Sequence, residues 1–316
     1  MSKGLIRRAG ELLAIAMAAA CLGTAVWAAD TVEDYIREYP NQQQTRMMNA
    51  WLKNNKPGTF RFTGLVDPTE TTVVTPQATV DYGYNWFSLT NGPAIINTPH
   101  YDQFFSVSVF DMNHNIPAVI VNPERPIVIL RPGQSAPEGD FTVVELETDQ
   151  GLAFTRMVVV DNMDEVRELS KSITMTGGDG DMNRAVATFP PEVEQAALAE
   201  IQRTDVAMNP DVAFGKKSGD VDPLVLARAV NLGQLGTPPD SVRYKVIVAD
   251  DNGAPLKGGD SYELTVPAGI VHDAGYYSIT VYGTDNKGLI PNPRGRYDRT
   301  SYSSTANADG TYTVSL

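Results

Sequence analysis

The stretch YELTVPAGIVHDAGYYSITVYGTDNKGLIPNPRGRY, residues 262–297, decides the fold predicted for this chain. It holds two runs of β-branched and aromatic residues, a polar turn and then a loop rich in arginine and tyrosine. A looser copy lies in residues 86–125, where Phe104–Asp111 (FFSVSVFD) matches Tyr276–Gly283 (YYSITVYG). Each copy is followed by Asn-Pro and then by arginine. An internal echo of this kind predicts two related β units.

Residues 59–160 consist of short β-branched and aromatic runs, separated by Gly, Pro, Asn and Asp. Many short strands with regular turn signals predict a sandwich or a barrel. Strands do not alternate with helices along this region, and no Gly-rich loop joins a strand to a helix. The sequence therefore argues against a doubly wound nucleotide-binding fold.

Two other regions have helical patterns. Apolar residues recur at three- and four-residue steps in residues 31–53, and Pro40 predicts a break into two short helices. The later region is expected to contain the helices Met163–Ser172, Glu192–Thr204 and Leu224–Leu232. The chain thus divides into a signal segment (1–28), a helical segment (29–58), a β-sandwich (59–162), a helical connector (163–241) and a second β-sandwich (242–316).

The first 28 residues have the pattern of a secretory signal peptide. A basic start with Lys3, Arg7 and Arg8 precedes the apolar stretch Leu12–Leu22, and small residues permit cleavage after Ala28. The apolar stretch is short for a membrane span, and no later run approaches about 18 apolar residues. We expect a periplasmic or secreted protein without a transmembrane segment.

The single cysteine, Cys21, lies inside this segment. Its surroundings match a lipoprotein cleavage box only weakly, so simple cleavage is favoured over lipidation. The remaining chain is long enough to fold without disulfides. The formal net charge of the whole chain is −13, and the signal segment carries three basic residues and one acidic residue. Such an acidic chain is not expected to bind nucleic acid or anionic membranes.

Asp111 and His114 are the candidate metal ligands, because imidazole and carboxylate groups suit zinc or manganese. Both fall in the turn DMNHN, residues 111–115. No His-x-His or His-x-x-x-His spacing supports them. Ordinary turn residues are the favoured alternative, and no other cofactor is expected.

Asn292, Arg294, Arg296 and Tyr297 form the densest polar and aromatic cluster. A guanidinium group can hold a carboxylate, a phosphate or a sugar oxygen with two hydrogen bonds. Arg and Tyr are also enriched in subunit interfaces. A structural role in locking the loop is ranked first, an interface second and ligand binding third.

Tyr82, Tyr84 and Trp86 alternate along one predicted strand and therefore share one face. Such a face can stack on the rings of a carbohydrate. It can equally line the core, which is the favoured interpretation.

YYSITVYGTDNKGLIPNPRGRY (residues 276–297) and NADGTYTVSL (residues 307–316) closely resemble the domain of unknown function 1214. That family has an aromatic-aromatic-Ser-x-Thr-x-Tyr strand, an Asn-Pro…Arg-Tyr loop and an Asp-Gly turn. The upstream unit, with Val80–Leu89 and Phe104–Asp111, resembles its usual partner, the domain of unknown function 1254. Pro76-Gln77-Ala78-Thr79-Val80 stands where relatives have Pro-Asn-x-Asp-Thr, with Asp81 displaced. Relatives also continue past the Asp-Gly turn, so an unpaired edge is expected in the last sheet.

The resemblance implies a mainly β protein with two jelly-roll sandwich domains joined by a helical connector. It also implies envelope export and homo-oligomers, with a trimer as the candidate state, and it supplies no reaction. The preferred function is therefore an exported, non-catalytic protein that binds a carbohydrate or small molecule or assembles in the envelope. The alternative is a periplasmic enzyme acting on a carbohydrate or a small organic acid, with a divalent metal as its possible aid.

Overall fold

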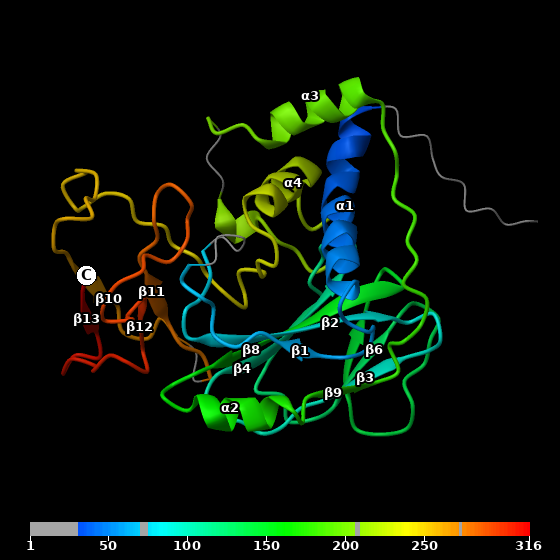
Figure 1. Ribbon diagram of the computed structural model, residues 1–316, viewed down its shortest axis with the longest axis horizontal. Coiled ribbons are helices and arrows are strands. Elements are labelled where there is room, and N and C mark those ends of the chain that lie inside the picture. Colours follow the sequence, from blue (N-terminus) through cyan, green and yellow to red (C-terminus); the bar gives the residue numbers. More distant parts are fainter. Residues whose placement is uncertain (1–30, 70–74, 206–208, 272–273) are drawn as a thin grey trace, which may run out of the picture.

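The computed structural model describes residues 31–69, 75–205, 209–271 and 274–316, which are mainly β, with several sheets and four α-helices (Figure 1). The helices are α1 Val32–Leu52, α2 Met163–Ser170, α3 Pro191–Ile201 and α4 Pro223–Leu232. The strands of the first unit are β1 Arg61–Phe62, β2 Val80–Ser88, β3 Ala94–Asn97, β4 Phe105–Asp111, β5 Ala118–Val121, β6 Ile127–Leu130, β7 Thr142–Glu145, β8 Gln150–Val158 and β9 Thr174–Thr176. The strands of the C-terminal unit are β10 Glu263–Val266, β11 Ser278–Thr280, β12 Asp298–Thr300 and β13 Tyr312–Ser315.

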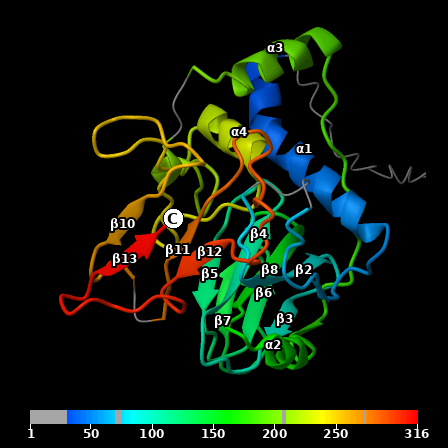
Figure 2. The same ribbon diagram turned by 60° about the vertical axis from the view of Figure 1, so that its left-hand side comes forward.

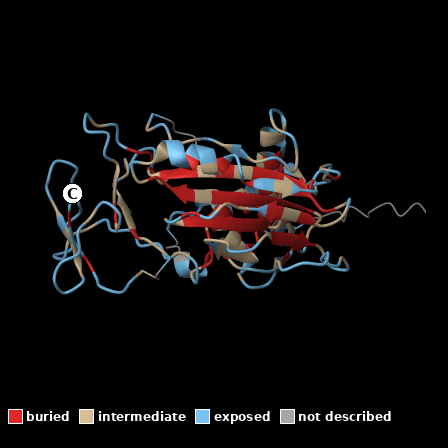
Figure 3. Ribbon diagram, turned by 90° about the horizontal axis from the view of Figure 1, so that it is seen from below, coloured by how far each residue is buried: buried red, intermediate tan, exposed pale blue. Residues whose placement is uncertain are grey.

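The first unit contains two sheets that share one apolar core. A five-stranded antiparallel sheet has the order β1-β2-β8-β4-β5, and a four-stranded sheet has the order β7-β6-β3-β9. Phe87 and Val107 from the first sheet and Ile96 and Ile129 from the second belong to the same cluster of buried side chains. The buried strands lie together in Figure 3, with exposed segments around them. Burial of this apolar surface is the main favourable contribution to folding here.

The opposite face of the five-stranded sheet is covered by α1, α3 and α4, whereas α2 lies near β9 (Figure 1). Trp86 and Phe154 point from the sheet into a second apolar cluster that includes Tyr35, Met48 and Val230. Successive residues of β2 therefore face different cores, since side chains alternate across a strand. Both faces of β2 are covered by a core, so every residue of the strand is buried or half-buried.

α1 is a single helix, so the predicted break at Pro40 does not occur. The Thr31 hydroxyl accepts a hydrogen bond from the Asp34 backbone N–H and caps the N-terminus. Tyr35, Tyr39 and Met48 are buried along the helix. Their packing outweighs the lost backbone hydrogen bond that a proline imposes inside a helix. The three helices predicted for the connector are present as α2, α3 and α4.

The C-terminal unit forms two two-stranded sheets, β10-β13 and β11-β12, where the sequence predicted a second sandwich. Its core is small and is built on Val266, Tyr277 and Val314. Residues 244–250 form no strand and take part in a single bridge, at Ala249. The reason is that only the short return through residues 254–256 pairs with them.

The two similar stretches, which begin at Phe104 and Tyr276, lie in contact. The rings of Phe104 and Tyr276, which begin the matching motifs, lie 4.9 Å apart between centroids. Figure 2 shows β11 and β12 beside the β4 and β5 side of the first unit. No helix within the described ranges is long and apolar enough to cross a membrane.

Candidate functional site

An open pocket of about 820 Å³ lies where the two sheets of the first unit part, between the β1 segment, α2 and β9. Its walls combine the apolar side chains of Phe60, Phe62, Met163, Ile173 and Met175 with threonine, serine and charged side chains. β1 has only two residues, so the sheet edge is short here. The pocket consequently opens directly onto the core shared by the two sheets, against which these side chains also pack.

Gly83 of β2 lets Phe62 lie against the sheet. A Cβ atom at Gly83 would approach the Phe62 ring to 2.4 Å and the Thr155 hydroxyl to 2.3 Å. Real Cβ atoms do not tolerate such contacts, so the close approach requires glycine. Phe62 therefore sits directly over Thr155 on the inner face of the sheet.

Asp81 provides a buried carboxylate in the pocket wall, with only 1% of its surface exposed. The Gly64 backbone N–H donates a hydrogen bond to its Oδ1 at 2.9 Å. Burial raises the pKa of Asp81 above the usual value, and the hydrogen bond from Gly64, the Ser170 hydroxyl and the charge of Arg167 partly oppose this effect. Loss of water disfavours the charged form of a carboxyl group, which is the physical cause.

Asn85 and Thr155 continue the polar inner face beyond Asp81. Asn85 Oδ1 and Thr155 Oγ1 are both buried without a hydrogen-bond partner. The Asn85 amide donates only a weak contact to the sulfur of Met175, at 3.5 Å. Buried polar atoms normally have partners, so two unpaired atoms behind the pocket walls mark a feature that needs an explanation.

The pocket thus joins an apolar stretch of wall to a buried carboxylate and to exposed polar side chains, and small-molecule sites likewise combine apolar surface with a few placed polar groups. Reasoning from the sequence missed it. Asp81 and Asn85 lie on one face of a predicted strand, but Thr155, Met163 and Met175 are distant along the chain. Only the register of β2 against β8, which pairs Gly83 with Thr155, brings them together.

The predicted aromatic face exists, and it lies on the other side of β2. Trp86 is buried in the cluster beneath the helices, with 3% of its surface exposed. Tyr84 stacks on Trp51 of α1 with ring centroids 4.4 Å apart. Both side chains pack as core residues, and a carbohydrate-binding role for them stays a prediction.

Asn292 organises the predicted Arg/Tyr loop. Its side-chain amide donates hydrogen bonds to the carbonyl oxygens of Ile290 and Arg296, and its Oδ1 accepts from the backbone N–H groups of Arg294 and Arg296. Arg294 and Arg296 are exposed, and Tyr297 is half-buried. The favoured structural role therefore falls on the asparagine. A ligand for the two arginines stays a prediction.

Asp111 ends β4 and shapes the turn after it. Its Oδ1 accepts from the backbone N–H groups of Asn113 and Asn115, both at 2.8 Å. Burial raises the pKa of Asp111 to about 6, and the neighbouring Glu147 carboxylate adds to the shift. Lys217 lies on the same small pocket of about 300 Å³.

His114 contacts other residues than those around Asp111. Its Nε2 accepts a hydrogen bond from the Leu235 backbone N–H at 3.2 Å, and its ring lies 5.6 Å from each of Phe110 and Phe214. Burial lowers the pKa of His114 to about 4. Across the part of the chain that the structure covers, no three His, Cys, Asp or Glu side chains gather as metal ligands. The metal site stays a prediction.

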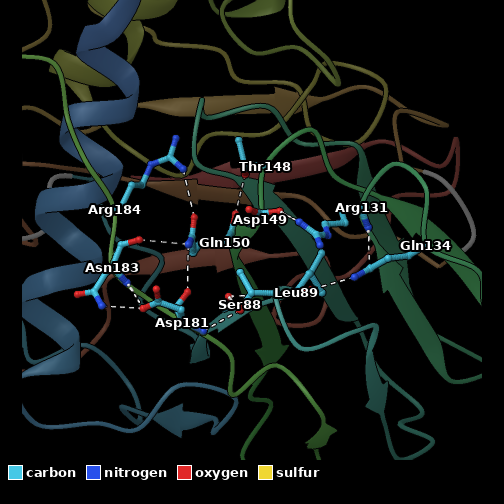
Figure 4. A network of polar contacts seen from close by, with 11 residues as sticks. Ser88, Leu89, Arg131, Gln134, Thr148, Asp149, Gln150, Asp181, Asn183 and Arg184 are labelled. Carbon is cyan, nitrogen blue, oxygen red and sulfur yellow. Dashed lines mark hydrogen bonds and ion pairs between the residues drawn. The ribbon is translucent and has the colours of Figure 1, made fainter. Parts of the chain in front are cut away.

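A polar network holds the segment after β9 against the first unit (Figure 4). The Gln150 side-chain amide donates to the carbonyl oxygen of Asp181 at 3.0 Å, and Arg184 donates to Gln150 Oε1 at 3.2 Å. On the same side, Arg131 pairs with Asp149 at 2.6 Å. The bonds from Gln150 and Arg184 hold residues 181–184 against the first unit.

Comparison with known proteins agrees with the resemblance. Residues 57–177 match the family described as "Protein of unknown function (DUF1254)", and residues 241–316 match "Protein of unknown function (DUF1214)". The crystal structure of the VPA0106 protein from Vibrio parahaemolyticus is similar, with a TM-score of 0.71 and 17% identity over 90% of this chain and 86% of that chain. At this identity the likeness shows the fold alone.

The structure of an uncharacterized protein from Burkholderia cenocepacia is less similar. Its TM-score is 0.41, with 12% identity over 88% of this chain and 76% of that chain, and nothing is inferred from it. No curated protein matches the chain. The two family matches follow one another along the sequence. The chain therefore belongs to the proteins of unknown function that carry DUF1254 and DUF1214 in tandem.

Proposed function

We propose that the protein is exported and binds a small molecule with an apolar body in the pocket between the β1 segment, α2 and β9. The observation that carries this proposal is the pocket itself, whose apolar walls surround the buried carboxylate of Asp81. Its volume of about 820 Å³ falls within the usual range for small-molecule sites.

Two buried polar atoms, Asn85 Oδ1 and Thr155 Oγ1, lie behind the pocket wall without a hydrogen-bond partner. Neither residue lines the pocket, so the buried polar group that a ligand would meet is the Asp81 carboxylate. The apolar body of the ligand would cover the exposed edges of Phe60 and Phe62.

The pocket supports binding better than catalysis. Its lining contains neither histidine nor cysteine, and the Ser170 hydroxyl, which also lines it, donates to the Val166 carbonyl oxygen at 2.7 Å. The same hydroxyl lies beside the Asp81 carboxylate and lowers the pKa of that acid, against the larger effect of burial. With no imidazole or thiol in the lining, we favour binding over catalysis.

Export and assembly belong to the same proposal. The signal-peptide pattern of residues 1–28 supports export. Val246 and Val248 are 82% and 71% exposed, and β10 to β13 each have one paired neighbour. Exposed apolar side chains and open strand edges favour association, here of the C-terminal units in a homo-oligomer such as a trimer.

Thermal unfolding of the purified protein tests the binding function. The panel contains neutral, cationic and anionic molecules with six-carbon apolar bodies, together with sugars and divalent ions. A ligand at about one hundred times its dissociation constant adds roughly 2.7 kcal/mol of stability. We expect apolar-bodied molecules to raise the midpoint. A shift with divalent ions alone, reversed by a chelator, would replace this function with the metal-assisted enzyme.

A further inference from the structure

We infer that the occupant of this pocket is a primary organic amine, with its ammonium group at the Asp81 carboxylate and its alkyl or aryl body along the apolar walls. The inference rests on the proposed binding function and adds the chemical class of the ligand. It follows from three features: the chemistry of the buried polar atoms, the position of the basic side chains and the aromatic rings at the entrance.

The unsatisfied polar atoms of the inner face are mostly hydrogen-bond acceptors. The Asp81 carboxylate accepts from the Gly64 backbone N–H and has the Ser170 hydroxyl beside it, and Asn85 Oδ1 is an acceptor without a donor. Thr155 Oγ1 can accept as well as donate. An ammonium group has three N–H donors and no acceptor, so it suits the Asp81 carboxylate, which is the member of this set that lines the pocket. An alcohol offers one donor, and a carboxylate offers none.

The placement of the basic side chains also favours a cationic ligand. Arg167 and Lys171 are the basic side chains that line the pocket, and both lie at its rim with 64% and 67% of the side chain exposed. Each pairs with an acid three residues earlier on the same helix, Asp164 at 3.2 Å and Glu168 at 2.5 Å. Arg167 acts on Asp81 from this exposed position, where solvent screens its charge, so no buried cation accompanies the carboxylate among the side chains that line the pocket. A bound ammonium group would supply one.

The entrance also suits a cation with an apolar body. The rings of Phe60 and Phe62 lie 6.1 Å apart and nearly parallel, with an interplanar angle of 21°. The face of an aromatic ring attracts a cation and also packs against methylene groups. Met163 and Met175 complete a wall that adapts to the shape of the bound body because methionine is flexible.

Isothermal titration of the purified protein with hexylammonium, 1-hexanol and hexanoate at pH 7.5 separates the possibilities. The three probes share one apolar body and differ in the head group. A charge-assisted hydrogen bond is stronger than a neutral one by an amount worth about tenfold in affinity. We expect hexylammonium to bind about tenfold more tightly than 1-hexanol, with hexanoate weaker than both.

Asp81→Asn keeps the shape of the side chain and removes its charge, so we expect the preference for hexylammonium over 1-hexanol to fall to about twofold or less. Asp164→Asn is the matched control, because Asp164 is 98% exposed on α2 and should leave the ratio unchanged. The wild-type ratio tests the inference even where Asp81→Asn fails to fold. Equal affinity for amine and alcohol overturns the amine inference alone. Tighter binding of hexanoate also overturns it, and no binding of any probe overturns the binding function as well.

Discussion

Gln77 donates a hydrogen bond from Nε2 to the carboxylate of Asp298 at 2.9 Å, across 221 positions of sequence. The same Asp298 oxygen accepts from the Thr79 hydroxyl at 2.8 Å, and Gln77 Nε2 also lies 2.7 Å from the Ser278 hydroxyl. These contacts fasten β11 and β12 of the C-terminal unit to the segment before β2. Gln77 and Thr79 thereby join the first unit to the C-terminal unit through side-chain hydrogen bonds.

Asp298→Ala should destabilise the protein by about 1–2 kcal/mol, because the donors of Gln77 and Thr79 would lose their acceptor in a half-buried place. Urea unfolding followed by circular dichroism measures the loss. Asp260→Ala is the control, since Asp260 is exposed and surface substitutions usually change stability by less than about 0.5 kcal/mol. Equal effects of the two substitutions would contradict a stabilising contact between the units.

Stability should depend on pH through Asp111. The pKa of this carboxyl is raised to about 6 in the folded protein, mainly by burial, so the folded state holds its proton more tightly than the unfolded chain. The favourable contribution is complete below about pH 4 and is lost as the pH rises through about 6.

Asp111→Asn removes this titration. The asparagine variant should therefore gain in unfolding free energy relative to the wild type between pH 4 and pH 8, by at most roughly 3 kcal/mol. Urea unfolding at several pH values measures the difference. A difference that stays constant with pH would show that Asp111 titrates normally in the folded protein.

Gly83→Ala should destabilise the protein by about 1–3 kcal/mol, the usual cost of overpacking a core. The new methyl group would meet the Phe62 ring at 2.4 Å and the Thr155 hydroxyl at 2.3 Å. Adding Thr155→Ala should recover part of the loss by removing one of the clashes. Gly258→Ala is the control, because nothing lies within 4 Å of its Cβ position. Thermal unfolding compares the three variants, and a neutral Gly83→Ala would contradict the close packing of Phe62.

Export is tested by N-terminal sequencing of the protein recovered from the cell envelope or medium. Cleavage after Ala28 is expected, so the mature chain should begin at Ala29. Replacing Leu12 and Leu13 with lysine should stop export, because the apolar stretch of a signal peptide does not tolerate charge. A chain that keeps residues 1–28 and stays inside the cell would contradict this expectation.

Local patterns in the sequence predicted much of the first unit. Alternation placed Tyr82, Tyr84 and Trp86 on one face of β2, and the structure confirms that arrangement. The two similar stretches form different strands. Phe105–Asp111 is fully buried and has a paired strand on each side, whereas Ser278–Thr280 pairs with β12 alone. Similar local sequence therefore gave different strand lengths, because the neighbours differ.

The candidate site depended on information that local patterns do not contain. Asp81 and Asn85 lie on the face of β2 opposite the aromatic residues, but both faces of this strand are buried, and the pattern shows no difference between a core and a pocket. Thr155 reaches them only through the register of β8. Met175 arrives from β9, a three-residue strand that the sequence did not predict.

The central claim is that a ligand occupies the pocket between the β1 segment, α2 and β9. Thr174 lines this pocket and Thr176, two residues along β9, does not, although both are exposed threonines. Measuring the affinities of hexylammonium and 1-hexanol for Thr174→Trp and Thr176→Trp therefore tests the claim most directly. The indole at position 174 should fill the pocket and weaken both ligands at least tenfold, an effect of about 1.4 kcal/mol, while Thr176→Trp should bind as the wild type does. Equal affinities in the two variants would show that the ligands bind elsewhere.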